Sequence, residues 1–278
     1  MNIDPALKKR LISASIGIFL LLLLIIFGGN IGITLLAAIL VILCSLELFQ
    51  LFFSAPEQPF KKMTGVVLTF LLFGIFAIEI HGLYFLSIFV LVILGLFVIT
   101  LIEARKLQQD QFMDLISNLS LIIFGAIYIA ATFAFLPKLR ALPSTGIMAT
   151  ILAFAIPWTG DTGAYFIGLR YGKNSLFKGV SPGKTVEGFI GGILVCIIFL
   201  LFTKLIFFRV LTLLDCVALG IIGTTAAHLG DLFESLIKRS RGVKDSGYLI
   251  PGHGGFLDRF DAFMFTTPIV YIYISLML

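Results

Sequence analysis

The sequence predicts an all-α protein that crosses a membrane several times, and its composition supports this class. Of its 278 residues, 59% are hydrophobic and only 13% are charged, and the mean hydropathy is +1.12. Soluble domains are about 45–50% apolar and about 25% charged. The apolar runs are continuous rather than alternating, which favours transmembrane helices over a β-barrel. Cys44, Cys196 and Cys216 each lie singly inside an apolar run, so they predict neither disulfides nor a metal site.

Apolar runs long enough to cross a bilayer occur at about nine places. We predict spans at 11–28, 31–53, 64–80, 83–102, 115–136, 146–169, 187–208, 210–232 and 262–278. The first run also resembles a signal peptide. Because further spans follow and no clear small-residue cleavage site is present, we interpret it as a transmembrane helix.

The basic residues predict which ends of the spans face the cytoplasm. If the N-terminus is cytoplasmic, the outer segments contain only Lys138, Arg140, Lys204 and Arg209 of the 20 Lys and Arg residues. Positive charge is enriched on the cytoplasmic side of membrane proteins. The net charge of +5 is therefore an orientation signal. With no nucleic-acid-binding motif in the sequence, we expect no nucleic-acid partner.

The two halves of the chain differ in their polar residues. Residues 1–150 are expected to form about five spans without a recognisable motif, and residues 151–278 a catalytic region with two cytoplasmic loops. Glu47 is a lone acid in the second span, where it serves either function or packing. There is no internal repeat of the kind that marks many transporters.

Three acids are expected to converge near the cytoplasmic boundary. If the eighth helix continues beyond its span, Asp231, Ser235 and Lys238 share one face. Asp258 and Asp261 are three apart and share a face of the last helix. Carboxylate oxygens suit Mg²⁺, whereas zinc prefers His or Cys. The spacing therefore allows a magnesium site formed by Asp231, Asp258 and Asp261.

The glycine-rich segment GHGG, which contains His253, Gly254 and Gly255, leads into the last helix. A helix start presents free N–H groups and a positive dipole end, which suit phosphate. The basic residues nearby are Lys238, Arg239, Arg241, Lys244 and Arg259. Each feature also has a structural explanation. Asp258 could stabilise a helix start, Arg259 could anchor the cytoplasmic end of a span, and the segment KRSRGVK could be a basic loop that touches anionic headgroups. Their occurrence within about thirty positions favours function.

A second polar group begins in the sixth span. A charge at a helix centre costs about 2.5–3.5 kcal/mol on insertion scales, so Asp161 is expected to face a polar cavity. Tyr165 lies one turn later on the same face. In the functional interpretation, Lys173 and Lys184 bind a triphosphate in this cavity, although the glycine spacing of a P-loop is absent.

The segment SPGKTVEG also predicts the start of the seventh helix. Ser181 or Thr185 is expected to cap it, and Glu187 lies near its first turn, where acids are favoured.

The segment from Ser235 to Asp261 resembles the signature of the phosphatidate cytidylyltransferases, also called CDP-diacylglycerol synthases. That signature has a serine, then Lys-Arg, Lys-Asp after four residues, His-Gly-Gly, and Asp-Arg-x-Asp. The matching residues are Ser235, Lys238, Arg239, Lys244, Asp245, His253, Gly254, Gly255, Asp258, Arg259 and Asp261. The segments GDTGAYFIGLRYGK and SPGKTVEG also resemble the family, so the resemblance covers roughly 157–262.

The resemblance implies that CTP and phosphatidate are converted to CDP-diacylglycerol and pyrophosphate for phospholipid biosynthesis. It implies a Mg²⁺ site at Asp231, Asp258 and Asp261, with a second cation as an open alternative, and a homodimer. Lys238, Arg259 and His253 join these acids as candidate catalytic residues. The candidate substrate-binding residues are Asp161, Tyr165, Lys173, Ser181, Lys184, Ser235, Arg239, Lys244, Gly254 and Gly255.

Cytosolic CTP and membrane-bound phosphatidate must meet where the cytoplasm touches the bilayer. We therefore expect an active site facing the cytoplasm, in a bacterial inner membrane. Two alternatives stay open. A CTP-dependent polyprenol or dolichol kinase would attack the γ-phosphorus with an alcohol, and an ion-coupled transporter would use Asp161 and Glu47 in its pathway.

Overall fold

The computed structural model describes residues 5–54, 58–78, 82–105, 107–247 and 254–277, the first ten of them by backbone alone. Their elements are α1 (Pro5–Phe27), α2 (Gly29–Phe52), α3 (Pro59–Ala77), α4 (Gly82–Ala104), η1 (Gln109–Gln111), α5 (Phe112–Phe133), α6 (Phe135–Ala141), α7 (Gly146–Tyr171), β1 (Ser175–Phe177), β2 (Ser181–Thr185), α8 (Val186–Ile206), α9 (Leu213–Ser240) and α10 (Leu257–Met277).

The helical membrane fold is confirmed. Within the described residues, seven helical stretches are long and apolar enough to cross a membrane. Each of the nine predicted spans overlaps a long helix, and the eighth continues to Ser240. Because α1 and α7 are not among the seven stretches, the number of spans stays a prediction. The sequence did not predict the short helix α6, most of which lies in the expected link after the fifth span.

A small antiparallel hairpin lies between α7 and α8. Strands β1 and β2 pair so that Ser175 lies opposite Thr185 and Phe177 opposite Ser181. Ser181 is therefore a strand residue, so of the two predicted candidates for the cap of the next helix, Ser181 or Thr185, the second is correct. Thr185 is the cap, because its hydroxyl accepts a hydrogen bond from Gly188 N at 3.1 Å.

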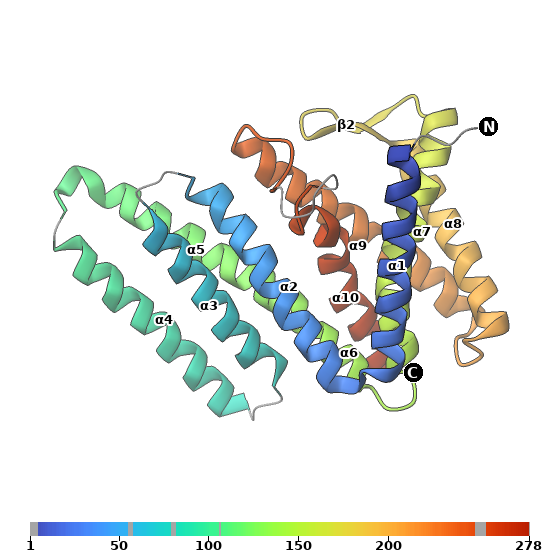
Figure 1. Cartoon of the computed structure of the whole chain (residues 1–278), viewed down its shortest axis with the longest axis horizontal. Coiled ribbons are helices and arrows are strands. Elements are labelled where there is room, and N and C mark those ends of the chain that lie inside the picture. Colours follow the sequence, from blue (N-terminus) through green and yellow to red (C-terminus); the bar gives the residue numbers. More distant parts are fainter. Residues whose placement is uncertain (1–4, 55–57, 79–81, 106, 248–253, 278) are drawn as a thin grey trace.

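The helices form two packed regions joined by α2. Helices α3, α4 and α5 lie together at one side, with α4 outermost, while α7, α8, α9 and α10 pack at the other (Figure 1). Helix α2 contacts α3 and α5 as well as α10. Its side chains Phe49 and Leu48 are fully buried in the shared apolar core. Helix α2 thus connects the N-terminal helices to the start of α10.

Glycines allow α7 to approach its neighbours closely. A Cβ built at Gly160 would lie 2.8 Å from Cγ2 of Thr224 in α9, and one at Gly163 would lie 2.7 Å from Cβ of Val195 in α8. Small residues bring membrane helices together in this way. The polar residue between these glycines, Asp161, lies 3.9 Å from Nδ1 of His228 in α9, and about half of its side chain stays exposed.

The far end of α9 is fixed by a separate polar cluster. The carboxylate of Asp215 accepts hydrogen bonds from Thr212 N at 2.7 Å and from the Tyr273 hydroxyl at 2.7 Å. The Thr212 hydroxyl in turn accepts from Asp215 N at 3.1 Å, which completes a capping box. This cluster ties the start of α9 to the end of α10.

Candidate active site

A cavity of about 460 Å³ lies where α7, α9 and α10 meet. Its polar lining consists of Asp161, Asp231, Lys238, Asp258, Arg259 and Asp261, and its apolar lining includes Phe154, Pro157 and Trp158. The two acids at the start of α10 therefore share a cavity with the acid of α9, as the sequence predicted. Close packing makes this possible, because a Cβ at Gly230 would overlap the carbonyl oxygen of Asp261.

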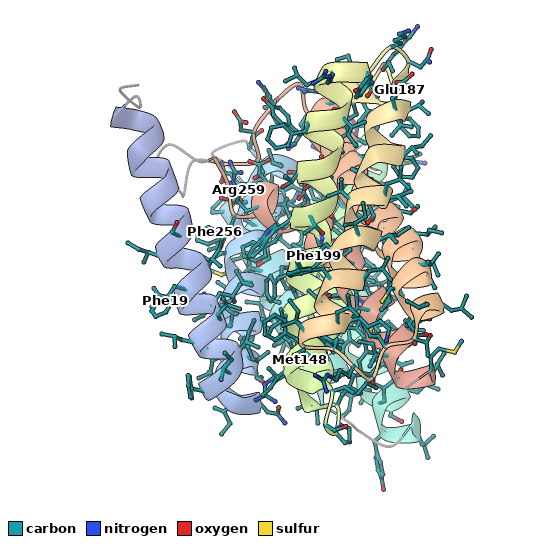
Figure 2. All side chains as sticks on the ribbon, turned by 90° about the vertical axis from the view of Figure 1, so that its right-hand side faces the viewer. Phe19, Met148, Glu187, Phe199, Phe256 and Arg259 are labelled. Atoms are coloured by element: carbon teal, nitrogen blue, oxygen red, sulfur yellow. The ribbon has the colours of Figure 1, made fainter. Side chains whose placement is uncertain are left out.

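Asp258 is the most extensively bonded of these acids. Lys238 Nζ donates to its Oδ1 at 2.6 Å, and the backbone N–H groups of Ser246 and Gly255 both donate to its Oδ2 at 3.0 Å. Gly254, just before, has a φ of +86°, which favours glycine. The carboxylate of Asp258 therefore organises the backbone that leads into α10. Phe256 and Arg259 are labelled at this start in Figure 2.

Lys238 joins two carboxylates. Besides Asp258 it pairs with Glu234, which lies one turn earlier on α9 and whose side chain is completely buried. A buried carboxylate is tolerated when a cation and hydrogen bonds compensate for the lost hydration. Sequence reasoning missed Glu234. Its spacing of four from Lys238 was the available signal.

Asp231 is paired across the site with the hairpin. Lys184 Nζ, from β2, lies 2.5 Å from Asp231 Oδ2, and the Ser235 hydroxyl lies 3.4 Å from Oδ1. Both partners of the ion pair are partly exposed, at 23% and 29% of their side-chain surface. The hairpin therefore places one of its lysines beside the acid of α9, so Lys184 and Ser235 belong to the site.

A second cavity of about 470 Å³ adjoins the first. Both are lined by Asp161 and Asp231, and the second adds Lys184, Tyr165, Thr185 and His228 with apolar side chains such as Leu169, Leu176 and Phe189. A charged cavity thus shares a wall with one that is largely apolar. Such a pair suits a ligand with a charged head and an apolar body.

His228 is a lining residue that sequence reasoning missed. Its side chain is only 5% exposed, Nδ1 lies 3.9 Å from Asp161 Oδ1, and its ring meets that of Phe189 edge-on. Within the described part of the chain neither ring nitrogen has a hydrogen-bond partner. The only feature of the sequence that pointed to His228 was its position three residues before Asp231 on the same helix.

Several predicted binding residues lie elsewhere. Lys173 and Lys244 are exposed and line neither cavity as described. Arg239 donates to the carbonyls of Val180 and Val243, so it joins the hairpin to the loop after α9. Ser181 lies in β2 and lines neither cavity. His253 lies outside the described residues.

Glu187 has a structural role at the base of the hairpin. Its carboxylate accepts from the backbone N–H groups of Lys173 and Asn174 and from the Asn174 side chain at 2.7 Å. It thereby holds the end of α7 against the start of α8.

The side chains of the site are of the type that Mg²⁺ prefers, but their positions do not form a coordination sphere. Among the residues that the structure describes, no three His, Cys, Asp or Glu side chains are grouped closely enough to hold a metal ion. Instead, Asp231 and Asp258 are each paired with a lysine ammonium. The donor set nevertheless consists of carboxylate oxygens facing a common cavity, which is the ligand chemistry that Mg²⁺ prefers.

The fold and this site define an integral membrane protein of helical class, with acidic and basic side chains gathered on cavities between its C-terminal helices. Residues 8–277 match the model of the cytidylyltransferase family, so the chain belongs to that family.

Similar proteins from three bacteria are named phosphatidate cytidylyltransferase. The protein from Bacillus subtilis is 42% identical over 159 residues, which is 56% of this chain and 58% of the relative. The one from Staphylococcus haemolyticus is 47% identical over 136 residues, 48% of this chain and 51% of the relative. The one from Staphylococcus aureus is 42% identical over 152 residues, 54% of this chain and 56% of the relative. The matched part therefore spans little more than half the length of these relatives.

Proposed function

We propose that the protein transfers the cytidylyl group of CTP to phosphatidate, giving CDP-diacylglycerol and pyrophosphate. The observation that carries the proposal is the cavity on which Asp161, Asp231, Asp258 and Asp261 meet the cations of Lys238 and Arg259. Family membership and the relatives' names support the same reaction.

In this reaction a phosphate oxygen of phosphatidate attacks the α-phosphorus of CTP. A new P–O bond forms there as the bond to the β-phosphate bridging oxygen breaks, and pyrophosphate leaves. A phosphate monoester has a second pKa of about 6, so the nucleophile is largely deprotonated at neutral pH. The reaction therefore needs no general base, and catalysis consists mainly of positioning and charge stabilisation.

The basic residues of the site supply that stabilisation. Lys184 lines the second, largely apolar cavity and pairs there with Asp231. Lys238 lines the first, charged cavity and lies between Glu234 and Asp258. A triphosphate entering here brings enough negative charge to compete with the carboxylates for both lysines. Lys184 and Lys238 then hold the phosphates, with Arg259 as a further cation lining the cavity of Lys238.

We propose that Mg²⁺ binds to Asp231, Asp258 and Asp261, with a second cation as an option. When bound, Mg²⁺ neutralises phosphate charge and aids departure of pyrophosphate. Asp258 already accepts three hydrogen bonds, so Asp231 and Asp261 have the more available oxygens.

We propose that the site faces the cytoplasm of a bacterial inner membrane. The hairpin and the start of α10 lie at the same end of the molecule as the start of α1 (Figure 1). In the predicted topology this end carries most of the Lys and Arg residues, which supports a cytoplasmic orientation. The proposed homodimer rests on the family resemblance.

The test uses the purified full chain in detergent with CTP, phosphatidate and Mg²⁺. We expect label in the cytosine of CTP to enter lipid. Label that enters from the γ-phosphate instead indicates a lipid kinase. Absence of CTP turnover, together with gradient-dependent uptake in vesicles, indicates a transporter. Either of these last two results contradicts the proposal.

A further inference from the structure

Glu47 reaches from the N-terminal helices into the active-site region. It belongs to α2, and the residue is only 3% exposed. Its Oε2 accepts a hydrogen bond from the Ser246 hydroxyl at 3.1 Å and another from Leu257 N at 2.9 Å. These partners lie 199 and 210 residues away along the chain. One carboxylate thus binds both described ends of the segment that joins α9 to α10.

The backbone of that segment is shaped around the carboxylate. A Cβ built at Gly247 would lie 2.7 Å from Glu47 Oε1, and one at Gly255 would overlap both Glu47 Oε2 and the Ser246 hydroxyl. Neither position has room for a side chain. The two glycines therefore let the chain close on Glu47 from two directions.

The same segment holds Asp258 from its other side. Ser246 donates its hydroxyl to Glu47 and its backbone N–H to Asp258 Oδ2. Gly255 N also donates to Asp258, while Leu257 N donates to Glu47. The backbone around Ser246 and Leu257 therefore lies between two carboxylates, of which Asp258 lines the cavity and Glu47 does not. A shift of this backbone would move Asp258.

We propose that Glu47 is a positioning residue for the reaction. It fixes both ends of the segment between α9 and α10, so that Asp258 and the first turn of α10 face the cavity. The inference rests on the proposed function for its catalytic consequence. It differs from a transport role for Glu47, since its carboxylate is bound to the backbone and a hydroxyl rather than lining a pathway.

The experiment compares Glu47→Ala, Glu47→Gln and Ser246→Ala in the full chain, with Asp215→Ala as the matched control. Asp215 is also a buried acid with several hydrogen bonds, but it lies at the opposite end of α9 from the site. Steady-state kinetics with CTP and phosphatidate, thermal unfolding and hydrogen exchange of the backbone amides are measured for each variant.

We expect Glu47→Ala to lower kcat and kcat/KM together by about 10–100-fold, the usual loss when a residue supporting a site's ligands is removed. Exchange should rise at Ser246 and Leu257 and stay unchanged in the middle of α9. Glu47→Gln keeps an acceptor oxygen and should recover most of the activity. Ser246→Ala removes one of the two hydrogen bonds and should have an intermediate effect. Asp215→Ala should lower thermal stability and leave kcat unchanged.

Three results would overturn the inference. One is a Glu47→Ala enzyme that loses stability as Asp215→Ala does but keeps its kcat. Another is unchanged exchange at Ser246 and Leu257 in that variant. The third is a Glu47→Gln enzyme as impaired as Glu47→Ala. If the wild-type chain shows no CTP turnover, the proposed function fails, and the exchange data still decide whether Glu47 holds the segment. If Glu47→Ala does not fold, Glu47→Gln and Ser246→Ala provide the test.

Discussion

Lys238 Nζ lies 2.6 Å from Asp258 Oδ1 and so joins the last turn of α9 to the first turn of α10. Both side chains are largely buried, at 11% and 12% exposed. A cation between two helices can hold their ends in register when the site is empty and bind phosphate when it is filled. This pair is therefore the first target for substitution.

Asp258→Asn should abolish formation of CDP-diacylglycerol while the protein still folds. Asparagine removes the negative charge that pairs with Lys238 and that would help to hold a metal ion. Product formation and thermal unfolding measure the two effects separately. Asp114→Asn, an exposed acid at the start of α5, should retain normal activity. Near-normal activity of Asp258→Asn would remove Asp258 from the site.

Lys184→Ala should raise the KM for CTP. A hydrogen bond to a charged group contributes about 1.5–3 kcal/mol, which corresponds to a change in KM of about 10-fold or more. Lys178→Ala, an exposed lysine of the same hairpin that lines neither cavity as described, is the control and should leave the KM unchanged. If both substitutions raised the KM for CTP equally, the cause would be the total positive charge of the hairpin and not a specific contact of Lys184.

Removal of divalent metal with a chelator should stop the reaction, and Mg²⁺ should restore it. Asp231→Asn should raise the Mg²⁺ concentration needed for half-maximal activity, because one carboxylate ligand is lost. A titration of activity against Mg²⁺ for wild type and variant provides the measurement. An identical titration for both would exclude Asp231 from metal binding.

Gly160→Leu should destabilise the fold by about 1–3 kcal/mol, the usual effect of overpacking a filled interface. Its Cβ would already lie 2.8 Å from Thr224. Thermal unfolding in detergent measures the change. Gly179→Ala, in the hairpin turn with nothing within 4 Å of its Cβ, should leave the melting temperature unchanged. A tolerated Gly160→Leu would mean that α7 and α9 are less closely packed than the structure has them.

The sequence predicted the long helices because each is an apolar run of sufficient length, and length and hydropathy are local properties. It also predicted the meeting of Asp231 with Asp258 and Asp261, because helix periodicity and a common membrane boundary place acids from separate helices at one level. The hairpin of β1 and β2 was missed, since its strands are short and lack an alternating apolar pattern.

The contacts of Glu47 and His228 could not be predicted from the sequence and are seen only in the three-dimensional structure. Glu47 meets partners about two hundred residues away, and no local pattern specifies such a pairing. His228 was hidden by its apolar neighbours, and only the packing of α7, α8 and α9 brings it to a cavity. In both cases the tertiary arrangement determines what the polar side chain contacts.

The hydrogen bonds from α2 to the approach of α10 limit how this protein can be cut. A fragment beginning at residue 151 would contain every described residue that lines the two cavities, yet it would leave the Ser246 hydroxyl and Leu257 N–H without their acceptor. We therefore expect that the motif-bearing half is not a self-sufficient module, and that N-terminal truncation abolishes the proposed activity even when the fragment inserts into the membrane.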